Sequence, residues 1–248
     1  DLTPYRIWLA VVVISSISYL SYLLRKFVFN DSGIIVAGIL GGLYSSTATT
    51  IVLAKQSRNL VYGQRHFAAG VILATAMMYL RIAILMAIFN MDLFLLLLPW
   101  FLLMTGISVA TALVILYFRS DTNSIKPPVV GENVNPLEFR IAIIFTLLFV
   151  AMSFITYFTV KRFGTNGLQA LAYIVGVTDI DPFLINLFQG KFGVGISMTA
   201  IATMQAILSN NILKLVYGLV LGGKKVRPFL MAGFGVILLA SILIIVLL

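Results

Sequence analysis

Long apolar runs separated by short polar stretches dominate the chain. Eight of these runs approach the length of about 20 residues that a helix needs to cross the hydrocarbon layer. They do not alternate apolar and polar residues, as the strands of a membrane barrel do. The pattern predicts an all-α, polytopic integral membrane protein with segments at residues 7–24, 33–54, 66–89, 93–118, 141–160, 167–189, 195–221 and 229–247.

The composition agrees with this pattern. The chain is 61% hydrophobic and 10% charged, whereas about a quarter of the residues in a soluble domain are charged. The net charge of +9 does not indicate a nucleic-acid partner, because Lys and Arg stand at the ends of apolar runs, where they meet lipid headgroups. We therefore expect a multi-pass protein of the cell (inner) membrane. Because the chain opens with Asp1, we also expect a piece of a longer protein or a processed one.

The two halves of the sequence resemble each other. With an offset of 134, Gly33 falls on Gly167 and Gly42 on Gly176. Each half then holds four apolar segments. This indicates two membrane repeats, 1–118 and 137–248, joined by the polar linker 119–136 into one integrated membrane domain. Two similar halves are common among secondary transporters.

Glycine followed by hydroxyl or carboxyl side chains interrupts the second segment of each half. Gly42 precedes a run of serines and threonines, and Gly176 precedes Thr178, Asp179 and Asp181. Matched interruptions are typical of broken helices that line a transport site. If segments two and six re-enter on the side from which they came, eleven Lys and Arg residues share one face and four the other. This asymmetry favours re-entrant segments and an inverted repeat, with broken spanning helices as the alternative.

Two carboxylates stand inside an apolar segment. An ionised carboxylate near the middle of the membrane costs about 2.5–3.5 kcal/mol, so such groups are normally functional or paired. Asp179 and Asp181 are therefore candidate ligands for a metal such as Mg²⁺, which takes carboxylate oxygens and keeps some of its waters, or candidate proton relays. The alternative is a structural ion pair with Arg81 or Lys214, which lie inside the third segments.

Further polar side chains stand in the same segments. The amide oxygens of Asn210 and Asn211 can accept hydrogen bonds or bind a cation. The hydroxyl groups can instead bond to their own helix and allow close packing. We expect one site shared by the two halves, with the ion-binding or substrate-binding residues Ser45, Ser46, Thr47, Thr50, Arg81, Asp179, Asp181, Asn210 and Asn211.

No pattern typical of an enzyme is visible. The chain has no cysteine and one histidine, which leaves no thiolate or His-rich metal site. It also shows no nucleophile–base pair and no cofactor fingerprint. We therefore expect a protein that is not an enzyme and that uses no cofactor other than a bound cation such as Mg²⁺.

The run GGLYSSTATT at residues 41–50, followed by AKQSR at 54–58, resembles a known family. It is similar to the polytopic membrane domain of unknown function found C-terminal to MgtC/SapB-type domains in prokaryotic proteins. Residues 176–181 and 209–214 resemble a second conserved region of that domain. The resemblance implies a helical membrane fold, a role in the homeostasis or transport of divalent cations, chiefly Mg²⁺, and an MgtC/SapB-type domain N-terminal in the full-length protein.

Together these features predict a transporter or channel for a small ion. A cation is favoured, either an Mg²⁺-like divalent ion or one moved in a proton-coupled manner, because the deep acidic residues stand two apart. The first alternative is an anion or polar solute held by Arg81, Lys214 and helix N-termini. The second is a non-transporting regulatory or assembly module. The expected partners are the lipid bilayer, a small ion and a second copy of the chain, with no nucleic acid.

Overall fold

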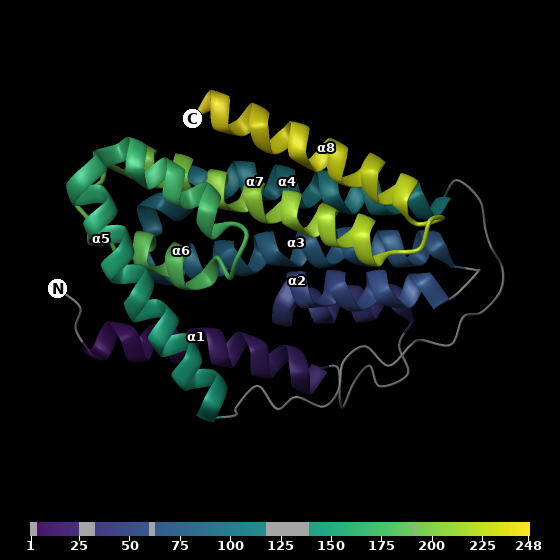
Figure 1. Ribbon diagram of the computed structural model, residues 1–248, viewed down its shortest axis with the longest axis horizontal. Coiled ribbons are helices and arrows are strands. Elements are labelled where there is room, and N and C mark those ends of the chain that lie inside the picture. Colours follow the sequence, from purple (N-terminus) through teal and green to yellow (C-terminus); the bar gives the residue numbers. More distant parts are fainter. Residues whose placement is uncertain (1–3, 25–32, 60–62, 118–138, 191) are drawn as a thin grey trace.

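A computed structural model describes residues 4–24, 33–59, 63–117, 139–190 and 192–248 (Figure 1). These ranges are largely helical and contain no strand. In chain order the helices are α1 (Pro4–Leu23), α2 (Ile34–Asn59), α3 (Gln64–Phe89), α4 (Met91–Tyr117), α5 (Phe139–Val175), α6 (Asp181–Phe188), α7 (Ile196–Leu221) and α8 (Arg227–Leu247).

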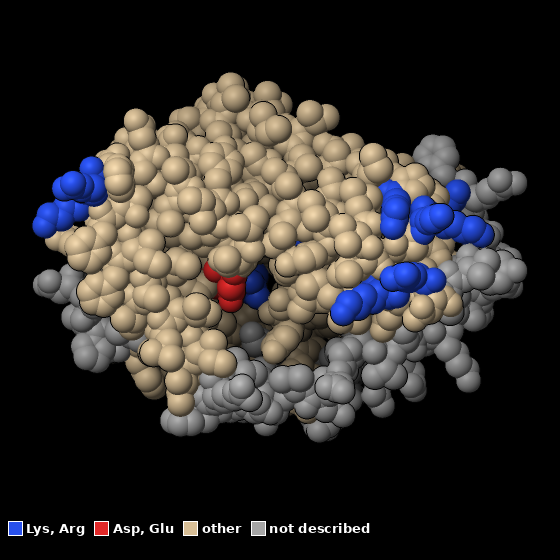
Figure 2. Space-filling model, viewed as in Figure 1, with Lys and Arg blue, Asp and Glu red and all other residues tan. Residues whose placement is uncertain are grey.

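By length and composition alone, six of the described helices are candidates to cross a membrane, namely α2, α3, α4, α5, α7 and α8, although α2 and α5 each contain a kink. Large apolar side chains cover the outer faces of α4 and α8, where Leu102 and Leu239 are 58% and 70% exposed. Figure 2 shows that Lys and Arg gather at the two ends of the molecule, with uncharged surface between them except in one central hollow. The prediction of a helical membrane protein is confirmed at this level, since only a lipid environment suits such a surface.

Helix α2 folds back on itself at Ser45. The backbone of Ser45 is extended, with φ −157° and ψ 106°. A Cβ added to Gly41 would lie 3.4 Å from the Cβ of Thr49, whereas residues eight positions apart in a continuous helix are separated by about 12 Å. Residues 34–44 and 46–59 are therefore the two arms of a hairpin, here named the first hairpin.

Segment six also contains a reversal. Helix α5 bends at Gly164, whose φ of 61° lies in the left-handed region that suits glycine. The helix ends at Val175, and residues 176–180 are not α-helical before α6 begins. Figure 1 shows α6 running back towards the side on which α5 bends. We name residues 165–188 the second hairpin.

The two hairpins lie along α3 from opposite ends. A Cβ on Gly70, near the start of α3, would lie 3.2 Å from the Ile34 carbonyl oxygen and 3.1 Å from a Leu53 methyl group, so both arms of the first hairpin pack there. At the other end of α3, the Asn90 side chain donates a hydrogen bond to the Phe188 carbonyl oxygen at 3.3 Å. The two hairpin tips consequently meet beside the middle of α3.

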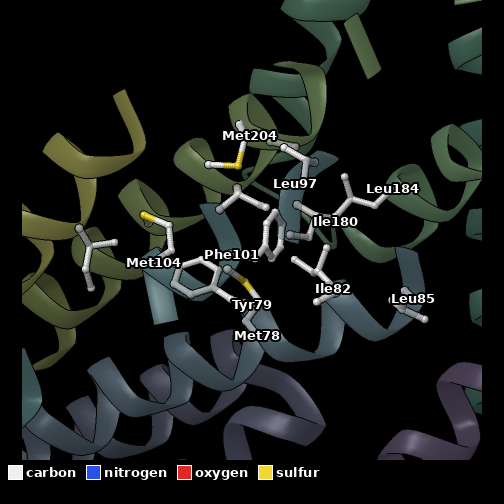
Figure 3. Packing of buried hydrophobic residues seen from close by; sticks show 14 of the residues in the cluster. Met78, Tyr79, Ile82, Leu85, Leu97, Phe101, Met104, Ile180, Leu184 and Met204 are labelled. Carbon is white, nitrogen blue, oxygen red and sulfur yellow. The ribbon is translucent and has the colours of Figure 1, made fainter. Parts of the chain in front are cut away.

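Large apolar side chains fix the second hairpin against α3 and α4 (Figure 3). Leu184 of α6 and Ile82 of α3 are fully buried in this core. The rings of Tyr79 and Phe101 meet edge to face, with centroids 6.3 Å apart and an interplanar angle of 83°. In a soluble protein, burying one such side chain stabilises the folded state by about 1.5–3 kcal/mol. Between helices in lipid, tight packing contributes most of the stabilisation.

The structure differs from the sequence interpretation in the position of one break. The break in segment two lies at Ser45 and not at Gly41–Gly42. Gly42 instead allows close helix packing, because a Cβ there would lie 2.5 Å from the Ala74 Cα. Segments five and six meet at Gly164, where the non-helical backbone of that residue divides α5 into two helices.

The domain division stays a prediction. The expected linker 119–136 lies outside the described residues. The eight predicted hydrophobic segments are not confirmed, since by length and composition six helices qualify as membrane spans among the residues described. The internal repeat likewise stays a prediction.

Candidate functional site

A cavity of about 530 Å³ lies where the two hairpin tips meet. Figure 2 shows a hollow near the middle of one face, with acidic and basic atoms inside it. The cavity brings together residues from both halves of the chain. Of the residues predicted from the sequence, those that line it are Ser45, Ser46, Thr47, Arg81, Asp179, Asp181 and Asn210.

Arg81 of α3 joins the two hairpin tips. Its Nη2 lies 2.8 Å from Oδ2 of Asp181 and donates to Oδ1 at 2.9 Å. Its Nη1 donates to the Tyr44 carbonyl oxygen at 2.8 Å. Both charged side chains are buried, at 8% and 5% exposure. The guanidinium therefore compensates a buried carboxylate and donates to a carbonyl at the end of the first arm.

Asp179 contributes a second carboxylate, and this one has no cationic partner. Its Oδ1 accepts a hydrogen bond from the Asp181 N–H at 3.2 Å. The residue is exposed and lines the cavity. Within the described ranges the one ion pair is that of Arg81 with Asp181. Asp179 thus offers the cavity a carboxylate that has no ion-pair partner among the described residues.

Two helix N-termini lie at the cavity. The Ser45 hydroxyl oxygen accepts a hydrogen bond from the Ala48 N–H at 3.3 Å, which caps the second arm of the first hairpin. Helix α6 starts at Asp181, with Pro182 in its first turn. Helix N-termini carry partial positive charge. At α6, Asp179 and Asp181 offset that charge, whereas the described part of the first hairpin tip has no acidic residue.

Asn210 of α7 supports the second tip and also offers an acceptor. Its Nδ2 donates to the Gly176 carbonyl oxygen at 3.1 Å. The neighbouring Ser209 hydroxyl donates to the Tyr173 carbonyl oxygen at 2.7 Å. The Asn210 Oδ1 is buried and has no hydrogen-bond partner among the described residues. Because buried amide oxygens are normally satisfied, this atom is suited to a ligand or water in the cavity.

Two predicted site residues, Thr50 and Asn211, do not line the cavity. Thr50 is fully buried and donates to the Ser46 carbonyl oxygen at 2.8 Å. Asn211 is fully buried and donates to the Tyr79 hydroxyl at 2.9 Å. Both side chains therefore stabilise helix packing.

The cavity also includes residues that the sequence did not single out. Met78 and Tyr217 come from α3 and α7, and Ser15 and Phe145 from α1 and α5. The Tyr44 carbonyl oxygen is a further example. Spacing along α7 could have indicated Tyr217, because it lies two turns after Asn210. Nothing in the sequence distinguishes Ser15 or Phe145 from other residues of an apolar run.

The metal prediction rests on two carboxylates. Among the described residues, no group of three or more His, Cys, Asp and Glu side chains could hold a metal ion. One of the two predicted ligands, Asp181, is engaged by Arg81. A divalent ion in this cavity would therefore keep most of its waters, as Mg²⁺ commonly does.

Comparison with known proteins yields a family but no activity. A protein of Aquifex aeolicus (strain VF5), described as uncharacterized, is 28% identical over 202 residues, which cover 79% of this chain and 85% of that relative. No solved structure was found to match. The family described as "Domain of unknown function (DUF4010)" matches residues 12–222. The chain, whose described helices include six candidate membrane spans, belongs to this family, the DUF4010 family.

Proposed function

We propose that this protein moves a small cation across a membrane, as a transporter or channel, and does not act as an enzyme. The observation that carries the proposal is the unpaired carboxylate of Asp179, held at the tip of a broken helical segment in a cavity. Non-helical backbone at membrane depth is tolerated where it is buried in protein or lines a water-filled cavity. A charged group there is by default a functional one.

The cavity offers a set of oxygen ligands suited to a partly hydrated cation. Asp179 supplies negative charge, and the amide oxygen of Asn210 is unsatisfied. The hydroxyl groups of Ser46 and Thr47 lie on the opposite hairpin tip. Oxygen donors of this kind suit Mg²⁺-like ions, Na⁺ and protons carried on a carboxylate.

The Arg81–Asp181 pair supplies a resting counter-charge. A cation that approached Asp181 would compete with the guanidinium of Arg81, which also holds Tyr44 of the other tip. Displacing Arg81 would therefore loosen the contact between the hairpins. We propose that this link couples ion binding to a relative motion of the two halves, arranged as an inverted repeat.

The distribution of basic residues supports one orientation. The first hairpin ends beside the α7–α8 turn, because the Gly223 N–H donates to the Ser57 hydroxyl at 3.1 Å. Basic residues of the described chain concentrate at that end, namely Lys55, Arg58, Arg65, Lys224, Lys225 and Arg227. We propose that this end faces the cytoplasm, with the protein in the cell (inner) membrane. A second copy of the chain and an MgtC/SapB-type domain are proposed partners.

Anion or polar-solute transport is the second candidate, and the first hairpin tip favours it. The first turn of the second arm, with Ser46 and Thr47, lies at the cavity without an acidic side chain of its own. Helix N-termini of this type bind anions. Against it, the Arg81 guanidinium is already engaged by Asp181.

Flux into proteoliposomes tests the proposal. The purified protein is reconstituted, and uptake of Na⁺, K⁺, Mg²⁺, Mn²⁺, chloride, sulfate and phosphate is measured against protein-free liposomes. We expect saturable uptake of at least one cation and none of the anions. Uptake of an anion alone would favour the second candidate, and no flux of any ion would leave the regulatory or assembly module as the better interpretation.

A further inference from the structure

Lys214 of α7 is a buried cation without an acidic partner. Its side chain is 0% exposed, and its Nζ lies 2.9 Å from the Met78 sulfur atom. No described carboxylate lies within ion-pair distance of it. Lysine is almost never fully buried unless it is paired, and an unpaired ammonium away from water is strongly disfavoured. Such a residue is retained in a membrane segment chiefly where its charge is used.

The surroundings of Lys214 place it within electrostatic reach of the cavity. Arg81 of α3 and Asp181 of α6 are the described charged groups that act on it. Three residues before Lys214 on the same helix, Asn211 donates a hydrogen bond to the Tyr79 hydroxyl group. Met78 contacts the ammonium group and also lines the cavity. The flexible side chain of Met78 thus separates Lys214 from the ion site, and a change of its rotamer would bring the two into contact.

With Asp179 and Asp181 both ionised, the charges around the cavity balance when Lys214 is protonated. Arg81 and Lys214 contribute two positive charges, and Asp179 and Asp181 contribute two negative charges. A monovalent cation beside Asp179 would leave one uncompensated positive charge in a region of low dielectric constant, where such an excess is costly. Loss of one proton from Lys214 restores the balance without any movement of the backbone.

We propose that Lys214 is the proton-carrying site of a cation–proton exchange. When a cation binds at Asp179, an N–H bond of the ammonium group breaks and its electron pair stays on Nζ. The proton passes Met78 to water in the cavity. When the cation leaves, the amine takes up a proton again, so each monovalent cation that moves one way is exchanged for a proton that moves the other way. This inference rests on the proposed cation transport and adds its energy coupling.

The test uses proteoliposomes that enclose a pH-sensitive dye, with the membrane potential clamped by K⁺ and valinomycin. Gradients of Na⁺ and of Mg²⁺ are imposed in separate experiments. For the wild type, we expect cation uptake to make the lumen more alkaline, and an acidic lumen to drive uptake against a cation gradient. Protein-free liposomes give the background proton leak.

Substitutions at Lys214 separate coupling from binding. Lys214→Met keeps the length of the side chain and removes its proton, so it should abolish the alkalinisation and make cation uptake insensitive to the pH gradient. Lys214→Arg keeps a permanent charge, because arginine is not deprotonated in proteins, and should block exchange and uptake together. Lys225→Met, in the exposed α7–α8 turn, is the matched control and should behave like the wild type.

The outcomes distinguish the two proposals. If the wild type moves neither Na⁺ nor Mg²⁺, and no other cation, the proposed function fails. If it moves a cation without any change in luminal pH, cation transport stands and the exchange is wrong. Exchange that persists in Lys214→Met would also overturn the assignment. If Lys214→Met does not yield a monodisperse protein, Lys214→Gln takes its place, and the wild-type measurement decides on its own.

Discussion

The side chains of Arg81 and Asp181, a hundred positions apart in the chain, form a buried ion pair with a separation of 2.8 Å. The same guanidinium holds the backbone of the first hairpin through the Tyr44 carbonyl oxygen. One side chain of α3 therefore joins both hairpin tips. The pair therefore lines the cavity and also forms part of the contact between the two halves.

Removing one partner of this ion pair should destabilise the protein more than removing both partners. Arg81→Gln leaves the Asp181 carboxylate buried without compensation, which costs about 3–5 kcal/mol. The double variant Arg81→Gln/Asp181→Asn should regain most of that stability, because no charge remains unpaired. The free energy of unfolding is measured in mixed micelles with increasing SDS, followed by tryptophan fluorescence. Additive losses in the double variant would show that the two residues do not interact.

Neutralising Asp179 should stop cation flux without unfolding the protein. Asp179→Asn removes the negative charge that is not paired within the described chain, so initial uptake should fall about tenfold or more, the factor for each 1.4 kcal/mol of lost binding. Asp181→Asn should also lower flux, together with stability. Asp92→Asn, exposed in the first turn of α4, is the control. Undiminished flux in both cavity variants would exclude the carboxylates from the mechanism.

A disulfide can test the first hairpin directly. The chain has no cysteine, so Gly41→Cys/Thr49→Cys introduces the only pair. With 3.4 Å between the two Cβ positions, the pair is close to disulfide geometry. We expect rapid crosslinking under mild oxidation, detected by mass spectrometry of the digested protein.

Ala68→Cys/Ala76→Cys is the matched control for that disulfide. These residues have the same spacing within α3, a helix that is continuous, so they should stay reduced. Equal behaviour of the two pairs would show that α2 does not fold back at Ser45.

The proposed orientation predicts which ends of the protein a membrane-impermeant thiol reagent can reach. Lys225→Cys lies in the α7–α8 turn, and Arg162→Cys lies just before the bend of α5, at the other end. In intact cells Arg162→Cys should be labelled, whereas Lys225→Cys should require permeabilised cells. Labelling of both from the same side would contradict the opposite placement of the two hairpins.

Composition and the length of the apolar runs were sufficient to predict the fold class. Lipid requires that backbone groups form hydrogen bonds within a helix and that outer side chains be apolar. Both requirements are visible in the sequence as apolar runs of about 20 residues. Asp179 and Asp181 could be singled out for the same reason, since carboxylates are rare in such segments. The glycines near residues 42 and 176 indicated interrupted segments, although the first break lies at Ser45.

Only the tertiary structure decided how these residues meet. Ser46, Thr47 and Thr50 belong to the same hydroxyl run, yet Thr50 is turned into the protein and bonds to its own helix. From the sequence, Arg81 and Lys214 were equivalent candidates for pairing with an aspartate. In the structure, Arg81 pairs with a carboxylate, whereas Lys214 contacts a methionine sulfur atom. Such choices depend on the directions of side chains from helices far apart in the chain. A sequence pattern specifies which face a residue occupies, but it does not specify which partner lies opposite.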